Sequence, residues 1–227
     1  RSLSSVRGDI VISAGASLSA VNAWLGKSWH AKNIHLMKPN LVSWRRFNKI
    51  ILPQHDWNDR TSPPHNVILT RLTPSFPSPF MGEGQGGGKE EKKVGILLGG
   101  NSDQYRMDPD WVDRLLDEIL KGTDKKLLVT TSRRTSPEVE SVVEKLLKNH
   151  PQCGLLEIAN RSKQNGVIER ILHDSAVILV TGESMSMVSE AVSSGKPVVV
   201  VFPPAKSRGV TKHFRMVREL EKQGFVK

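Results

Sequence analysis

The chain has 227 residues, 37% of them hydrophobic, which is enough for one large domain or two small ones with separate cores. No apolar run reaches the roughly 18 residues that cross a bilayer, so the sequence pattern excludes a spanning helix. A single cysteine, Cys153, excludes an internal disulfide and any cysteine-cluster metal site. We therefore expect two α/β lobes in a reducing, cytoplasmic compartment.

The net charge of +10 is concentrated at the front of the chain, because residues 1–75 hold ten Lys or Arg against three Asp or Glu. Such a field favours anionic partners, such as phospholipid headgroups or phosphorylated acceptors. Nucleic acid is not expected, since aromatic residues are scarce and no nucleic-acid-binding motif accompanies the basic residues. We expect a peripheral position at the inner face of a membrane, with a solvated basic surface as the alternative.

The first predicted elements are a short apolar strand at 9–13, a tight turn and a helix that reaches about Leu25. Three more short apolar strands follow, and the spacing between them leaves little room for long crossover helices. Residues 1–73 are therefore predicted to be a partial N-terminal Rossmann-like lobe, whose first strands and helices are absent from this chain. The three further strands are predicted at 33–37, 49–52 and 66–70.

Residues 74–93 separate the two lobes and are rich in Pro and Gly, with a run of charged residues at their end. Pro breaks strand ladders, and Gly raises the entropy cost of ordering the chain. This composition predicts a flexible linker or an inserted loop at the lobe boundary.

Residues 94–227 alternate regularly between apolar strands and amphipathic helices. Near-continuous apolar strands such as Ala-Val-Ile-Leu-Val are typical of parallel sheets that are covered on both faces. The pattern predicts a doubly wound, C-terminal Rossmann-like lobe of the α/β class that binds a nucleotide. Its strands are predicted at 94–98, 126–130, 154–158, 176–180 and 197–201, and its helices at 110–120, 137–149, 166–172, 187–194 and 211–223.

In open α/β sheets, ligands bind beyond the carboxyl ends of the strands, so the turns that follow the strands are the candidate sites. The first candidate turn contains Gly99, Gly100, Asn101 and Ser102. Paired glycines let the backbone approach a ligand, and the Asn and Ser side chains offer polar contacts. An ordinary glycine turn is the alternative, and the pattern matches neither the dinucleotide fingerprint nor the Walker motif.

The second candidate turn contains Thr131, Ser132, Arg133 and Arg134. Guanidinium groups pair with phosphate oxygens in a fork, so two adjacent arginines beside hydroxyl groups predict a diphosphate clamp. The alternative is one solvated arginine and one hydroxyl that caps the next helix.

The third candidate turn runs from Thr181 into a helix and includes Ser184, Met185 and Ser186, with Glu190 further along the helix. Free amides at a helix start attract an anion, and a carboxylate inside the helix could accept the hydroxyls of a ribose. The alternative is that the serines cap the helix and Glu190 pairs with a lysine.

His55, which follows a strand of the front lobe, is the one candidate for a catalytic base, and Asp56 could orient it. A lone histidine is more often structural. No carboxylate–histidine cluster indicates a metal site, so we expect no metal and no bound cofactor.

Several segments together resemble one family, the mitochondrial fission proteins named for elongated mitochondria in plants, and their bacterial relatives of uncharacterised function. The resemblance implies a two-lobed fold similar to GT-B glycosyltransferases, with the donor nucleotide in the C-terminal lobe and the acceptor facing the N-terminal lobe. It also implies that the Ser-rich turn before Glu190 holds diphosphate and ribose. The matching segments are 52–56, 66–70, 99–102, 106–108, 130–135, 184–191 and 195–197.

The leading hypothesis is a metal-independent glycosyltransferase-like protein that binds a nucleotide diphospho-sugar and transfers the sugar to a cell-envelope acceptor at the membrane surface. The alternative is a non-catalytic interaction protein that keeps the scaffold and acts at a membrane in a fission-type role. A sugar-nucleotide epimerase is disfavoured, because the cofactor fingerprint is missing and Tyr105 has no Lys at helical spacing after it.

Overall fold

The computed structural model describes residues 7–57, 61–72, 92–162, 165–207 and 209–227. The chain divides into two compact units, residues 1–74 (unit 1) and residues 75–227 (unit 2). Most of the predicted linker, residues 74–91, lies outside the described residues, and the last residue assigned to it, Lys93, is the first residue of a strand.

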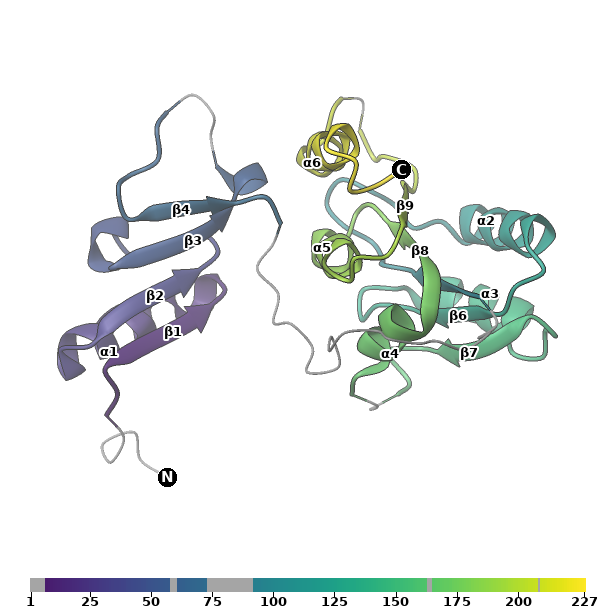
Figure 1. Ribbon diagram of the computed structural model, residues 1–227, viewed down its shortest axis with the longest axis horizontal. Coiled ribbons are helices and arrows are strands. Elements are labelled where there is room, and N and C mark those ends of the chain that lie inside the picture. The colour runs from purple at the N-terminus through teal and green to yellow at the C-terminus, as the bar shows by residue number, and fades with distance from the viewer. Residues whose placement is uncertain (1–6, 58–60, 73–91, 163–164, 208) are drawn as a thin grey trace. The chain divides into compact units, whose positions relative to one another are not determined.

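Unit 1 is a four-stranded parallel sheet whose strands lie side by side in chain order (Figure 1). A helix joins the first two strands, and each later connection holds one 3₁₀ turn among its described residues, as the short spacing predicts. Its elements are β1 (Ile10–Ala14), α1 (Ser19–Trp29), β2 (Lys32–Leu36), β3 (Lys49–Pro53) and β4 (Val67–Thr70), with 3₁₀ turns at Ala16–Leu18, Trp44–Arg46 and Gln54–Asp56.

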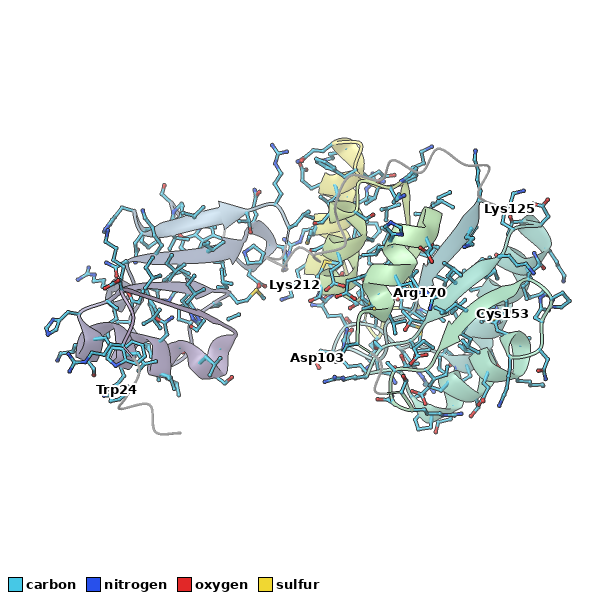
Figure 2. All side chains as sticks on the ribbon, turned by 60° about the horizontal axis from the view of Figure 1, so that its bottom comes forward. Trp24, Asp103, Lys125, Cys153, Arg170 and Lys212 are labelled. Carbon is cyan, nitrogen blue, oxygen red and sulfur yellow. The ribbon has the colours of Figure 1, made fainter. Side chains whose placement is uncertain are left out.

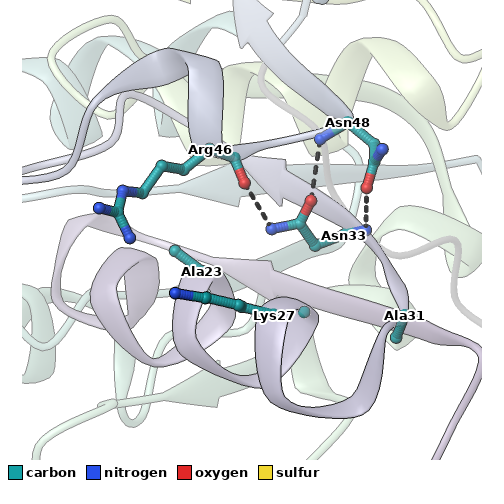
Figure 3. A pocket seen from close by; sticks show the side chains of 7 residues that line it. Ala23, Lys27, Ala31, Asn33, Arg46 and Asn48 are labelled. Atoms are coloured by element: carbon teal, nitrogen blue, oxygen red, sulfur yellow. Dashed lines mark hydrogen bonds between the residues drawn. The ribbon is translucent and has the colours of Figure 1, made fainter.

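Helix α1 extends past the predicted end at Leu25 and stops at His30, which adopts the left-handed conformation with φ 53°. Non-glycine residues rarely adopt this conformation, so the sequence carried no stop signal there. Gly26 lies inside the helix at a point of close contact with β2. A Cβ at this position would be only 2.9 Å from the Asn33 Nδ2 atom, which explains why the residue is a glycine. Asn33 in turn pairs reciprocally with Asn48, through bonds of 2.8 and 2.9 Å that tie the starts of β2 and β3 together (Figure 3).

The two faces of the unit 1 sheet differ in their cover. Helix α1 packs on the face that carries Ile50 and Leu52, both fully buried. On the opposite face Ile10, Ile12 and Ile68 are 57%, 60% and 46% exposed, and no helix among the described residues of unit 1 covers them. Trp24 projects from the outer side of α1 (Figure 2).

Unit 2 is a five-stranded, all-parallel sheet in the order β7-β6-β5-β8-β9. The chain adds β6 and β7 on one side of β5 and then crosses back to add β8 and β9 on the other side (Figure 1). Its elements are β5 (Lys93–Leu97), α2 (Pro109–Gly122), β6 (Leu127–Thr130), α3 (Pro137–Leu147), β7 (Cys153–Glu157), α4 (Val167–Asp174), β8 (Ser175–Thr181), α5 (Met185–Ser193), β9 (Val198–Val201) and α6 (Lys212–Lys222).

Helices cover both faces of the unit 2 sheet. Ile96 of β5 belongs to the core formed with α2 and α3. The neighbouring Gly95 points the other way, because a Cβ there would lie 2.9 Å from Ile171 of α4. Helices α4 and α5 contact β5, β8 and β9. This arrangement confirms the predicted doubly wound α/β class and explains why the strands read as unbroken apolar runs.

Candidate functional site

The candidate site lies at the carboxyl edge of the unit 2 sheet, between β5 and β8. These two strands are neighbours, but the connections that follow them leave in opposite directions. Such a switch point opens a crevice between the loops at the strand ends, where ligands bind in this class of fold. The loops after β5, β6 and β8 are those that the sequence singles out.

Hydrogen bonds join the β5 loop directly to the β8 loop. The Gly99 amide donates to Thr181 Oγ1 at 2.8 Å, and the Gly100 amide donates to Glu183 Oε1 at 2.8 Å. A Cβ on Gly99 would lie 1.6 Å from the same carboxylate oxygen, and a Cβ on Gly100 would lie 2.2 Å from the backbone of Arg134. The space beside both glycines is therefore filled by the protein, whereas the sequence suggested an approaching ligand.

The β6 loop is bonded to the same glycines. Thr135 Oγ1 donates to the Gly99 carbonyl at 2.5 Å and accepts the Ser132 amide at 2.9 Å. The Asn101 amide donates to the Arg134 carbonyl at 3.2 Å. The three predicted turns thus converge at one edge, as their positions after parallel strands lead us to expect.

Arg133 and Arg134 are both exposed at this edge. The Arg134 side chain turns toward the β5 loop, where its Nη1 donates to the Asn101 carbonyl at 3.3 Å. This bond leaves most of the donors of the guanidinium available, because arginine has five N–H groups. Thr131 is buried, and its hydroxyl accepts the Ala159 amide at 3.0 Å.

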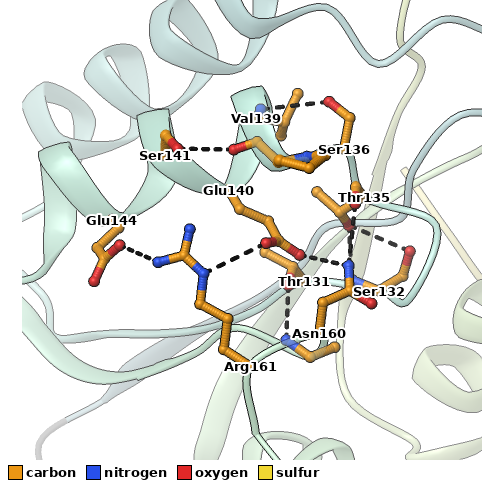
Figure 4. A network of polar contacts seen from close by, with 12 residues as sticks. Thr131, Ser132, Thr135, Ser136, Val139, Glu140, Ser141, Glu144, Asn160 and Arg161 are labelled. Atoms are coloured by element: carbon orange, nitrogen blue, oxygen red, sulfur yellow. Dashed lines mark hydrogen bonds and ion pairs between the residues drawn. The ribbon is translucent and has the colours of Figure 1, made fainter.

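A buried polar network between α3 and the segment after β7 holds the β6 loop in place. Glu140 of α3 is 3% exposed and accepts a bond from Asn160 Nδ2 at 2.6 Å. Arg161 lies 3.6 Å from Glu140 and also pairs with Glu144. Asn160 donates in addition to the Thr135 carbonyl at 3.2 Å, so the segment after β7 is anchored to the β6 loop (Figure 4).

Asn101 and Ser102 are engaged within the protein. Asn101 Oδ1 accepts the Met107 amide at 2.9 Å, and Ser102 Oγ accepts the Tyr105 amide at 3.1 Å. Lys206, from the segment after β9, donates to the Ser102 carbonyl at 2.6 Å. These bonds hold the shape of the β5 loop.

Helix α5 begins at this edge without a side-chain cap. Asp108, Ser136 and Thr211 cap α2, α3 and α6, but Ser184 makes no capping bond to α5. Ser184 and Met185 are buried, and Ser186 is exposed. The first-turn amides of α5 therefore have no acceptor from an N-cap side chain, which is the condition in which a helix start binds an anion.

Glu183 is a member of the site that the sequence reasoning missed. It is 2% exposed, one oxygen accepts bonds from Gly100 and Thr181, and the other has no partner among the described residues. Burial raises the pKa of Glu183, against the hydrogen bonds and the charge of Arg134, which lower it. A glutamate placed directly between a strand and a helix in Thr181-Gly182-Glu183-Ser184 was the available signal.

Glu190 lies further along α5, half-buried. Burial raises the pKa of Glu190, and the negative charge of Glu169 raises it further. No hydrogen bond or ion pair to its side chain occurs within the part of the chain that the structure describes. The lysine partner that the alternative interpretation required is thus not found there.

His55 belongs to unit 1, in the 3₁₀ turn directly after β3. Its side chain is 7% exposed, and its Nε2 lies 3.9 Å from Asp56 Oδ1. The imidazole is therefore placed near the predicted carboxylate but has little contact with solvent.

Neither a metal cluster nor a membrane-spanning helix is found in the described part of the chain. Among the described residues, no three His, Cys, Asp or Glu side chains are grouped to hold a metal ion. None of the helices in the described ranges combines the length and apolar character needed to span a bilayer.

Solved structures with the same fold include enzymes of sugar nucleotides. A Listeria monocytogenes protein assigned as a UDP-N-acetylglucosamine 2-epimerase matches 92% of this chain with TM-score 0.56 and 13% identity. The glycotransferase of kitacinnamycin matches 99% with TM-score 0.52 and 12% identity. The UDP-GlcNAc 2-epimerase from Neisseria meningitidis bound to UDP-GlcNAc matches 97% with TM-score 0.51 and 16% identity.

The chain spans 60%, 64% and 69% of these three structures. At such identities the likeness shows the fold alone, and it confirms the predicted GT-B-like class. Because epimerases and a glycosyltransferase share this fold, the missing cofactor fingerprint does not by itself separate the two reaction classes.

Sequence comparison gives the family. The family model described as Mitochondrial fission ELM1 matches residues 2–227. An uncharacterised protein of Rickettsia prowazekii (strain Madrid E) is 23% identical over 252 residues, which cover 95% of this chain and 70% of that protein.

Proposed function

This chain belongs to the mitochondrial fission ELM1 family, and from that premise and the geometry of unit 2 we propose that it is a glycosyltransferase-like protein that binds a nucleotide diphospho-sugar. The observation that carries the proposal is the uncapped start of α5 at the β5–β8 switch point, with Arg134 held against the facing loop. Helix amides and guanidinium groups together form a site for a diphosphate.

In this proposal each part of the ligand binds the groups of unit 2 whose charge and hydrogen-bonding character match it. The diphosphate lies between the α5 amides after Ser184 and the exposed guanidinium groups of Arg133 and Arg134. The ribose hydroxyls donate to Glu190, whose carboxylate accepts no hydrogen bond from another side chain in the described part of the chain. Gly99 and Gly100 act indirectly, by letting the β5 loop close against Glu183 and the Arg134 backbone.

The proposed reaction moves the sugar from the diphosphate to an acceptor hydroxyl of the cell envelope. The bond from the anomeric carbon to the diphosphate oxygen breaks, and a bond to the acceptor oxygen forms while the acceptor hydroxyl gives its proton to a general base, for which His55 is the candidate. Negative charge grows on the departing diphosphate, and the α5 amides and the two arginines stabilise it without a metal. UDP-GlcNAc, which the Neisseria epimerase binds, is the first donor to test.

A second candidate function is a non-catalytic interaction protein that keeps the nucleotide site and acts at a membrane. The low exposure of His55, 7% for the side chain, favours it, because a base must touch the acceptor hydroxyl. UDP-GlcNAc is incubated with the protein and envelope glycolipids, and the release of UDP is measured. Release by the wild-type protein that is lost in His55→Ala supports the enzyme. Tight UDP-GlcNAc binding without sugar transfer supports the interaction protein, and conversion to the 2-epimer would indicate the epimerase class.

Isothermal titration with UDP and with uridine tests the site itself. Arg133→Ala and Arg134→Ala should each weaken UDP binding by about 1.5–3 kcal/mol and leave uridine binding unchanged, since uridine has no phosphate. Glu190→Gln should weaken both ligands alike. Arg114→Ala, which removes an exposed arginine from α2, is the matched control.

Equal losses for UDP and uridine in the arginine variants would reject the clamp. An unchanged affinity in Glu190→Gln would reject the ribose role. If wild-type protein binds neither UDP nor ADP, the nucleotide proposal fails as a whole.

A further inference from the structure

Unit 1 contains a cavity of about 270 Å³ that the nucleotide proposal does not use. It lies between the last turns of α1 and the starts of β2 and β3, with Ala23, Gly26, Lys27, Asn33, Arg46 and Asn48 among its walls (Figure 3). These strand starts form the amino edge of the sheet, whereas His55 follows the carboxyl end of β3. The cavity is therefore distinct from both the catalytic candidate and the loops of unit 2.

The polar groups of the cavity wall divide into two kinds. The Asn33 side chain is held within the protein, since its oxygen accepts the Asn48 amide at 2.9 Å and its Nδ2 donates to the Arg46 carbonyl at 2.9 Å. Lys27 and Arg46 are exposed, and their charged ends turn to the same side of the cavity, beyond Ala23 (Figure 3). The groups left to meet a ligand are thus hydrogen-bond donors: the two cations and the Asn48 Nδ2 group, for which no acceptor is found among the described residues.

Neither cation has an acidic partner among the described residues. Lys27 stands in the last turn of α1, where its charge offsets the helix dipole, but Arg46 comes from a separate 3₁₀ turn. Two like charges directed to one place repel each other, and an anion bound between them removes that cost. Residues 1–75 hold only three acids to compete for this role.

The outer side of α1 adds an apolar feature beside the cavity. Trp24 is 60% exposed one turn before Lys27, and Val21 and Leu18 are 45% and 47% exposed at three-residue spacing before it. Residues three apart lie on one side of a helix, as Val21 and Trp24 do in α1, and Leu18 continues this spacing from the 3₁₀ turn that leads into the helix, so the three form a stripe. Exposed tryptophan flanked by basic residues is typical of proteins that rest on a membrane interface.

We propose that this cavity binds a phosphate group, and that the phosphate belongs to an anionic phospholipid on which the Leu18–Val21–Trp24 stripe rests. The site is formed by unit 1 alone and does not depend on a nucleotide in unit 2. Lys27 and Arg46 pair with the phosphate oxygens, while Trp24 enters the interface beside the headgroup.

The test is sedimentation of the full chain with vesicles of phosphatidylcholine, with and without phosphatidylglycerol, beside titration with glycerol phosphate. Each basic residue at an anionic surface changes partitioning about fivefold, so Lys27→Ala/Arg46→Ala should bind phosphatidylglycerol vesicles roughly thirtyfold more weakly. Arg114→Ala/Lys145→Ala removes the same charges from α2 and α3 and should change binding less than about twofold. Lys27→Arg/Arg46→Lys, which keeps both charges, should restore binding.

The outcomes separate the parts of the proposal. Equal losses in the two double alanine variants would overturn it, because net charge alone would then explain binding. If the wild-type protein binds neither phosphatidylglycerol vesicles nor glycerol phosphate, the proposal is also overturned. Trp24→Ala should weaken vesicle binding and leave glycerol phosphate binding unchanged; glycerol phosphate binding without vesicle binding would overturn the lipid source and keep the phosphate site.

Discussion

Replacing Gly99 with alanine should destabilise unit 2, because the new Cβ would lie 1.6 Å from Glu183 Oε1 and 2.8 Å from its Cδ. Glu183 is 2% exposed, so its carboxylate has no open space into which to move. Displacing it breaks the bonds from the Gly100 amide and the Thr181 hydroxyl. Each buried group left without a partner costs about 1–3 kcal/mol, so we expect a loss of about 2–4 kcal/mol in the free energy of unfolding.

A double-mutant cycle identifies the cause. In the Glu183→Ala background the space beside Gly99 is open, so Gly99→Ala should add less than about 1 kcal/mol. Gly100→Ala should keep its full cost in that background, because its Cβ would lie 2.2 Å from the Arg134 carbonyl group. Gly122→Ala is the control, since a Cβ there meets no atom within 4 Å.

Urea unfolding, together with hydrogen exchange at β5, measures these free energies. Additive costs for Gly99→Ala and Glu183→Ala would refute the reasoning. So would a Gly99→Ala protein as stable as the Gly122→Ala control.

Two further predictions concern buried carboxylates. Burial raises the pKa of Glu183, so its contribution to the free energy of unfolding is complete below the ordinary glutamate pKa and is lost as pH rises through the raised value. Glu183→Gln should remove this part of the pH dependence in urea titrations, and an unchanged slope would contradict the assignment. Arg161→Ala should cost about 1–2 kcal/mol, because Glu140 stays buried without its cation, while Arg161 itself is partly exposed. The Glu140→Gln/Arg161→Ala protein should recover part of that loss in thermal unfolding, and no recovery would show that the charge of Glu140 is not the cause.

The strands and helices of unit 2 could be predicted from the sequence because each is a local pattern. Apolar runs gave β6 and β8 to within a residue or two, and Pro137 marked the start of α3. The end of α1 could not be predicted, since His30 takes a backbone conformation that the sequence does not signal.

The position of the candidate site was predictable for a different reason. Loops that follow neighbouring parallel strands meet at one edge whatever their sequence, so the turns at Gly99, Thr131 and Ser184 had to converge once the strand order was right. The role of the glycines was not predictable, because the atoms that exclude a Cβ belong to Glu183 and Arg134. Whether Ser184 caps α5 was equally undecided, because several hydroxyls stood near the helix start.

The bonds between the β5 loop and the β8 loop connect residues that are 82 and 83 positions apart in the chain. Closing so long a segment carries an entropy cost that is recovered only when β8 docks beside β5. On a chain leaving the ribosome, β5, β6 and β7 can assemble while the carboxyl edge still lacks its second wall. The crevice at the switch point is therefore completed late in folding, and a ligand that fills it should bind the finished unit and not the partly folded forms that precede it.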